Sequence, residues 1–108
     1  MKWSLVFLFC LLSMQLVRAQ DQMKIDSLKI QLNNVIEDTT KVKLLFDLSD
    51  VYGRTDLIMA LQYAKEALQL SIQAGSELLE ARSHIKIGSN LILIGNYDEA
   101  LKNFLASF

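Results

Sequence analysis

The feature that most constrains this chain of 108 residues is an internal repeat with a period near forty residues. Ala60-Leu61 recurs as Ala100-Leu101, and in the segment before each pair Leu48 recurs as Ile87. Self-similarity at such a period is typical of arrays in which one supersecondary unit stacks on the next. The repeat therefore predicts an elongated array built of at least two similar units.

The spacing of apolar residues within each unit is that of helices. Apolar side chains recur at steps of three and four residues, which places them on one face of a helix. The chain has no proline and only four glycines, fewer turn residues than a small β protein usually needs. We predict an all-α antiparallel array of helix pairs, preceded by a spacer and one short helix within residues 20–40.

The breaks between the expected helices carry side chains that can cap a helix start. Asp38 or Thr39 would accept from free backbone N–H groups of the helix that follows, as would Thr55 or Asp56 in the next break. Asn96 stands in the same position before the last expected helix. Gly75-Ser76 ends the helix before residue 77, so the two units lie at about 41–76 and 77–108.

The first nineteen residues have the three parts of an export signal. Lys2 gives a positive start, Leu5 to Leu12 is unbroken and apolar, and Val17-Arg18-Ala19 offers a cleavage site before Gln20. The alternatives are an uncleaved membrane anchor and a helix buried in the fold. A spanning helix needs about 20 apolar residues, and Arg18 interrupts the run too early. We predict a signal peptide over 1–19 and a protein that faces the periplasm or the cell surface.

Charge and residue types exclude several classes of function. Without the leader, nine basic groups remain against twelve acidic ones, which gives no basic field for nucleic acid or a membrane surface. The only cysteine, Cys10, lies in the leader, so the mature chain has no thiol chemistry. No residues stand at metal-ligand spacing, form a phosphate loop or pair a nucleophile with a base. We therefore predict no enzyme, no metal and no cofactor.

The second unit carries the more specific motif. His84, Ile87-Gly88 and Leu91 precede the stretch Gly-Asn-Tyr-Asp-Glu-Ala-Leu at 95–101, with Phe104 beyond it. In these positions the chain resembles the tetratricopeptide repeat (TPR) family, over about residues 41–108. The first unit departs more from the family, with a serine for the usual glycine and Ala64 for the usual aromatic residue. The longer period predicts longer helices than usual.

The resemblance implies which residues pack the helix pairs. Both units place apolar or small side chains at the family's packing positions, and a central glycine implies close approach of two helices. His84, the only histidine, is expected to pack at such a position rather than bind a metal. The implied packing residues are Leu45, Leu48, Tyr52, Ala60, Ala67, His84, Ile87, Gly88, Leu91, Ala100 and Phe104.

The resemblance also implies a binding groove. In TPR proteins the inner face of each first helix lines a concave channel, and the matching residues here are Lys43, Phe46, Asp50, Arg82, Ile85 and Ser89. The alternative is a merely solvated face. The subclass that grips a peptide's terminal carboxylate uses Lys and Asn at two of these positions, and this sequence does not match it. The expected partner is a protein or a peptide.

The leader, the short helix and the Asp-Thr-Thr junction at 38–40 resemble the sensor regions of certain bacterial membrane proteins. There the array precedes a membrane helix and a histidine kinase or DNA-binding output. The sequence thus favours a non-catalytic interaction module outside the cytoplasm, and the alternative is the sensor fragment of a signalling protein.

Phe104 and Phe108 on an uncovered last helix favour a truncated array, with self-association as the alternative. Any membrane tether would come from downstream sequence.

Overall fold

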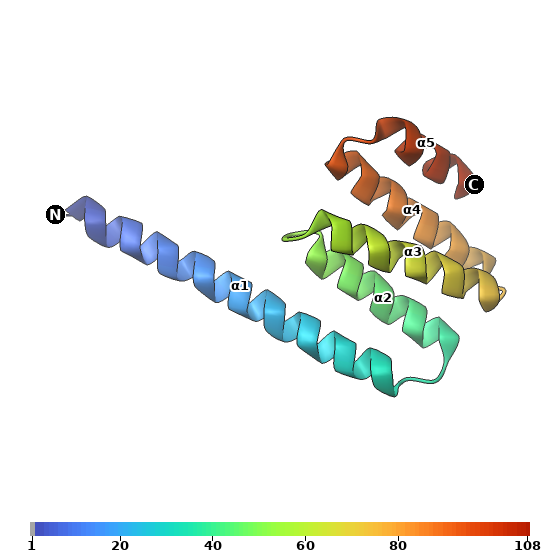
Figure 1. Ribbon diagram of the computed structural model, residues 1–108, viewed down its shortest axis with the longest axis horizontal. Helices are drawn as coiled ribbons and strands as arrows, with labels where there is room; N and C mark the ends of the chain where they lie inside the picture. The colour runs from blue at the N-terminus through green and yellow to red at the C-terminus, as the bar shows by residue number, and fades with distance from the viewer. Residues whose placement is uncertain (1) are drawn as a thin grey trace.

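The computed structural model describes residues 2–108, and within that range the chain forms only helices (Figure 1). Met1, the first residue of the predicted leader, lies outside the described residues. The helices are α1 (Lys2–Asn34), α2 (Asp38–Tyr52), α3 (Leu57–Gln73), α4 (Glu77–Ile94) and α5 (Tyr97–Ala106). The predicted all-α fold is confirmed.

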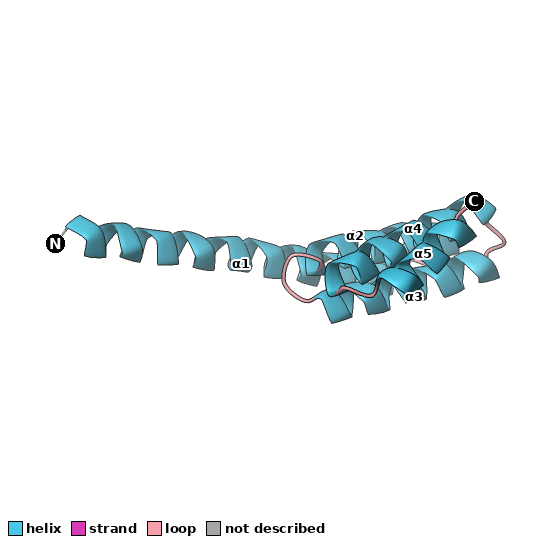
Figure 2. Cartoon of the chain, turned by 90° about the horizontal axis from the view of Figure 1, so that it is seen from above, coloured by secondary structure: helices cyan, strands magenta, loops and turns pink. Residues whose placement is uncertain are grey.

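Helices α2 to α5 form two hairpins that stack side by side. Each helix contacts the next one in the chain, and α2 also contacts α4 across the junction between the hairpins. Figure 2 shows the consequence, since α2 and α4 lie in one layer and α3 and α5 in the other. The molecule measures 61 × 36 × 16 Å and is a thin array. The first helices of both hairpins therefore share one face.

Two glycines end helices by adopting a backbone conformation that other residues avoid. Gly75 follows α3 with φ 68°, and Gly95 follows α4 with φ 98°. The backbone N–H of Asn96 then donates to the carbonyl of Leu91 at 2.9 Å, which satisfies an otherwise free group of the last turn. These left-handed turns reverse the chain tightly enough for α3, α4 and α5 to pack in succession.

Capping side chains begin three of the helices. Asp56, Ser76 and Asn96 each accept a hydrogen bond from a backbone N–H three residues later, at 3.2, 3.3 and 3.4 Å. The expectation that Asp38 or Thr39 caps α2 is wrong. Glu37 holds the N-cap position there, and its carboxylate accepts from the Thr39 hydroxyl at 2.7 Å instead of from the backbone.

The core consists of three clusters that follow one another along the array. The first joins α1 to α2, the second joins α2, α3 and the start of α4, and the third joins α3, α4 and α5. Ala60, Ala64 and Ala67 are completely buried, so α3 approaches both neighbours closely through small side chains. Of the residues expected to pack, Tyr52, His84 and Phe104 are half-buried, and the structure buries Leu45, Leu48, Ala60, Ala67, Ile87, Gly88, Leu91 and Ala100.

Helix α1 has two parts with different surroundings. Its second part packs Ile25 and Leu28 into the first cluster, with Leu32 beside them. The first part projects away from the array (Figure 1), and residues 2–20 are all exposed. The alternative of a buried leader helix is therefore wrong. The expectation of a spacer and one short helix within residues 20–40 is also wrong. Residues 20–34 belong to the single long helix α1, since no proline or glycine interrupts the chain there.

An ion pair fixes α1 just beyond the predicted cleavage site. The guanidinium of Arg54, in the turn after α2, lies 2.8 Å from a carboxylate oxygen of Asp21. The Asp21 side chain is only 13% exposed, although most of its neighbours in α1 lie open to solvent. The segment that would follow Ala19 in a processed chain is thus attached to the array by its own contacts.

Candidate functional site

A groove lies between α2 and α4, the two helices that share one face of the array. Its volume is about 570 Å³, and both units of the repeat contribute lining residues. They are Lys43, Phe46, Asp47, Asp50, Arg82, Ile85 and Lys86. The structure thus brings together five of the six residues that the sequence nominated, all except Ser89.

The floor of the groove is apolar. Phe46 is 7% exposed and packs into the second core cluster, so the fold holds its ring in place. Ile85 stands at the equivalent position of the second unit and is 46% exposed. The exposed isoleucine lies beside this buried aromatic ring. Burial of the isoleucine side chain against an apolar group of a partner would favour binding, because apolar surface is removed from water.

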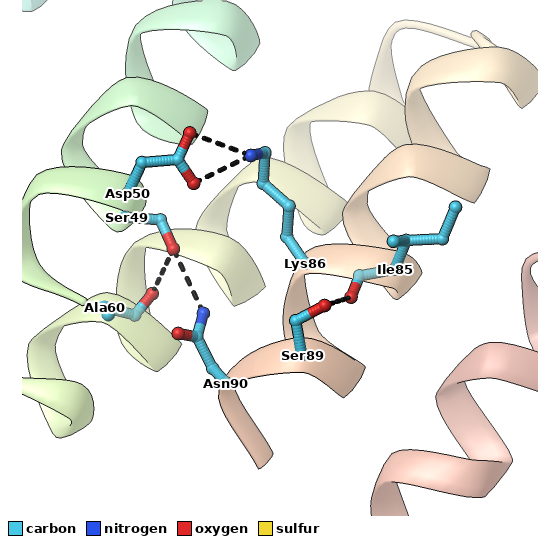
Figure 3. A network of polar contacts seen from close by, with 7 residues as sticks. All are labelled: Ser49, Asp50, Ala60, Ile85, Lys86, Ser89 and Asn90. Atoms are coloured by element: carbon cyan, nitrogen blue, oxygen red, sulfur yellow. Dashed lines mark hydrogen bonds and ion pairs between the residues drawn. The ribbon is translucent and has the colours of Figure 1, made fainter. Parts of the chain in front are cut away.

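One ion pair crosses the groove and joins its walls. The ammonium of Lys86 on α4 lies 2.8 and 3.0 Å from the two carboxylate oxygens of Asp50 on α2 (Figure 3). The same ammonium lies 5.3 Å from the centre of the Phe46 ring, within range of a cation–π interaction. Because the Asp50 side chain is 60% exposed, this pair adds at most about 1 kcal/mol to stability.

Ser89 does not line the groove. Its hydroxyl donates to the carbonyl of Ile85 on the same helix at 2.9 Å (Figure 3). Serine commonly satisfies its hydroxyl in this way inside a helix. The position that the family resemblance assigned to ligand contact is therefore occupied by a side chain bonded to its own backbone.

A buried polar network supports the groove from below. The side-chain amide of Asn90 on α4 donates to the Ser49 hydroxyl at 3.1 Å, and that hydroxyl donates to the carbonyl of Ala60 on α3 at 2.8 Å (Figure 3). Ser49 and Asn90 are both buried. Three helices are thus joined by hydrogen bonds one turn away from the residues that line the groove, which fixes the relative positions of its walls.

With the paired units and their shared groove in place, comparison with known proteins identifies the family. The family model described as the SusR N-terminal TPR domain matches residues 13–106. The chain belongs to this TPR family. No curated protein and no solved structure matches the chain. TPR domains mediate protein–protein interaction, and their helical repeats are typically non-catalytic.

His84 occupies a packing position of the second TPR unit. Its Nδ1 lies 3.0 Å from the side-chain oxygen of Asn103 on α5, and the amide nitrogen of Asn103 donates to the carbonyl of Glu99 at 3.0 Å. Because an amide oxygen can only accept, Nδ1 carries the proton in this arrangement. The only histidine thus joins the two helices of its hairpin, outside the groove.

The sequence reasoning missed two residues of the TPR groove, Asp47 and Lys86. They are equivalent by the thirty-nine-residue offset, and each lies four residues after another lining residue, Lys43 or Arg82. Residues four apart share one face of a helix, so the helical spacing was a sufficient signal. The positions taken from the family resemblance did not include these two residues.

Proposed function

We propose that the α2–α4 groove binds an extended or helical segment of a partner protein outside the cytoplasm, and that the chain catalyses no reaction. The observation that carries this proposal is that both units line the α2–α4 groove, with an apolar floor between charged side chains. Apolar anchors on the floor supply binding free energy, while charges at the edges select the partner and set its register.

The proposed location rests on the first part of α1. That part is apolar and exposed, and α1 is long and apolar enough to cross a membrane. A signal sequence near an N-terminus has the same character. Among the described residues of the leader, 2–19, no side chain is buried, so removal of the leader would leave the contact between Asp21 and Arg54 in place.

A second candidate function is that of a sensor segment in a transmembrane signalling protein. The matching family is described as an N-terminal domain, which favours a chain that is followed by further domains. In this case partner binding to the groove would be the input of a signal. A histidine kinase or a transcriptional regulator would then transmit that signal.

The groove is tested by selecting peptides from a displayed random library on the purified protein. Ile85→Asn removes an exposed apolar group from the groove, and Leu101→Asn removes an exposed leucine from α5, outside the groove. Peptides selected on the original chain should bind Leu101→Asn unchanged and lose most of their affinity for Ile85→Asn. Equal binding to both variants would contradict the groove.

Export is tested with a reporter enzyme that is active only outside the cytoplasm. A fusion to the full chain should be active, and a fusion that begins at Gln20 should be inactive. Mass spectrometry of the exported chain should find Gln20 at its amino terminus. A chain that keeps the leader after export would instead support the membrane anchor.

A further inference from the structure

The groove carries two cations that its own carboxylates leave unpaired. Among residues 2–108, Lys86 is paired with Asp50, whereas Lys43 and Arg82 form no ion pair. They stand at equivalent positions of the two units, thirty-nine residues apart, and both line the groove. The lining thus holds three cations and two carboxylates, in a chain whose residues after the leader carry an excess of acid.

The local helix geometry does not neutralise these cations. Arg82 has Lys86 four residues later on the same face of α4, and two like charges at that spacing repel each other. Lys43 has Asp47 four residues later, but the two form no ion pair. An anion that reaches this part of the groove would therefore meet cations that have no competing partner in the fold.

From this arrangement we infer that the partner segment carries acidic side chains next to an apolar one. The apolar side chain would pack on Phe46 and Ile85, and aspartate or glutamate side chains would pair with Lys43 and Arg82. Because one cation comes from each unit, the ligand contacts both hairpins at once. This inference rests on the proposed function and specifies which protein segment the groove prefers.

The test uses the same displayed peptide library, and the number of acidic residues in the selected peptides is compared with that in the unselected library. Peptides selected on the purified protein should be enriched in Asp and Glu beside Leu, Ile or Phe. A short peptide with two glutamates flanking a leucine, blocked at both ends, is the defined probe, and its glutamine counterpart is the control. The acidic peptide should bind about tenfold more tightly, and this difference should shrink as salt is added.

Variants of the groove distinguish specific pairing of charges from non-specific binding of the peptide. Lys43→Gln with Arg82→Gln should abolish the preference for the acidic probe, whereas Lys65→Gln with Lys102→Gln, on exposed positions of α3 and α5, should preserve it. Asp50→Asn frees Lys86 as a third cation and should increase affinity for the acidic probe. A residue with a purely structural role would not produce this gain.

The experiments distinguish a failure of the proposed groove function from a failure of the inference about charge. If no peptide is selected that depends on Ile85, the proposed groove function fails. If selected peptides depend on Ile85 but show no acidic enrichment, the groove function stands and the inference about charge is wrong. Binding that requires a free carboxyl terminus, and is lost in blocked peptides, would also overturn the assignment to acidic side chains.

Discussion

The two TPR units differ in which helix of the hairpin carries the larger side chain at two equivalent positions. In the first unit, Ser49 on α2 faces α3, and its hydroxyl donates to the Ala60 carbonyl. The equivalent position of the second unit is Gly88, where an added Cβ would lie 2.8 Å from the ring of Phe104 on α5. Phe104 in turn is equivalent to Ala64 of the first unit by the forty-residue offset.

The difference teaches that a bulky side chain on the second helix of a hairpin needs a small residue at the facing position of the first helix. The first unit combines a serine with an alanine, and the second combines a glycine with a phenylalanine. The glycine leaves room for the ring, because protein interiors are close-packed and an added side chain at that position would overfill the site. The departures of the first unit from the family pattern are thus matched to each other.

Gly88→Leu should break the second hairpin and has the largest expected effect. The new side chain must displace the Phe104 ring or push α5 away, which we expect to lower the free energy of unfolding by about 3 kcal/mol. Urea unfolding followed by far-ultraviolet circular dichroism measures this loss. Ser89→Leu, on the exposed neighbouring position, is the control, and an unchanged midpoint for Gly88→Leu would refute close packing.

Placing the first unit's residues, serine and alanine, at the equivalent positions of the second unit should cost less stability than the two single changes together. Phe104→Ala alone should cost about 2 kcal/mol, because the ring is half-buried. Gly88→Ser alone should also destabilise, by crowding the ring. Combined, the two changes should cost about 1 kcal/mol less than their sum, since serine occupies space that the ring has left. Strict additivity in this double-mutant cycle would contradict volume exchange between α4 and α5.

The hydroxyl of Ser49, and not only its size, should matter in the first unit. Ser49→Ala leaves the amide of Asn90 without its hydrogen-bond acceptor in a buried site, which should cost about 1.5 kcal/mol. Adding Asn90→Leu removes the stranded amide and should recover part of that loss. If Ser49→Ala is neutral by chemical denaturation, the polar network contributes nothing to the junction between the units.

The smallest expected effect is a sensitivity to alkali that only the first unit has. Tyr52 and Tyr63 stack at 5.4 Å, and the Lys29 ammonium lies 5.8 Å from the centre of the Tyr52 ring. Burial raises the pKa of Tyr63, and the side-chain hydrogen bond with Tyr52 raises the pKa of Lys29. The equivalents of the two tyrosines in the second unit are Leu91 and Asn103, which do not titrate.

The sign of this pH effect follows from the raised pKa values. The folded chain keeps protons over a range in which the unfolded chain has lost them, so stability is present at lower pH and falls as pH rises above about 10. Unfolding midpoints measured from neutral to alkaline pH should decline, and Tyr63→Phe should reduce the decline. An identical pH profile in that variant would exclude Tyr63 as a source.

The match between sequence and structure is closest where the signal is local. The ends of α3 and α4 at Gly75 and Gly95, and the N-caps at Asp56 and Asn96, depend on residues within one turn of each break. Glu37 was missed at the start of α2 because neighbouring Asp and Thr side chains offered equally good local candidates. The extent of α1 was missed because polar residues at 20–22 suggested a spacer, yet none of them breaks a helix.

The sequence by itself determined the helices of the two units, their order and the repeat, because apolar periodicity and turn chemistry act over short distances. The resemblance to the TPR family supplied five of the seven residues that line the groove. Only the tertiary structure decided which charges pair across the groove and which remain free. Lys86 bonds to Asp50 thirty-six residues away, and Gly88 meets Phe104 on another helix. Such contacts depend on the angle and spacing of packed helices, which the burial of the whole core fixes together.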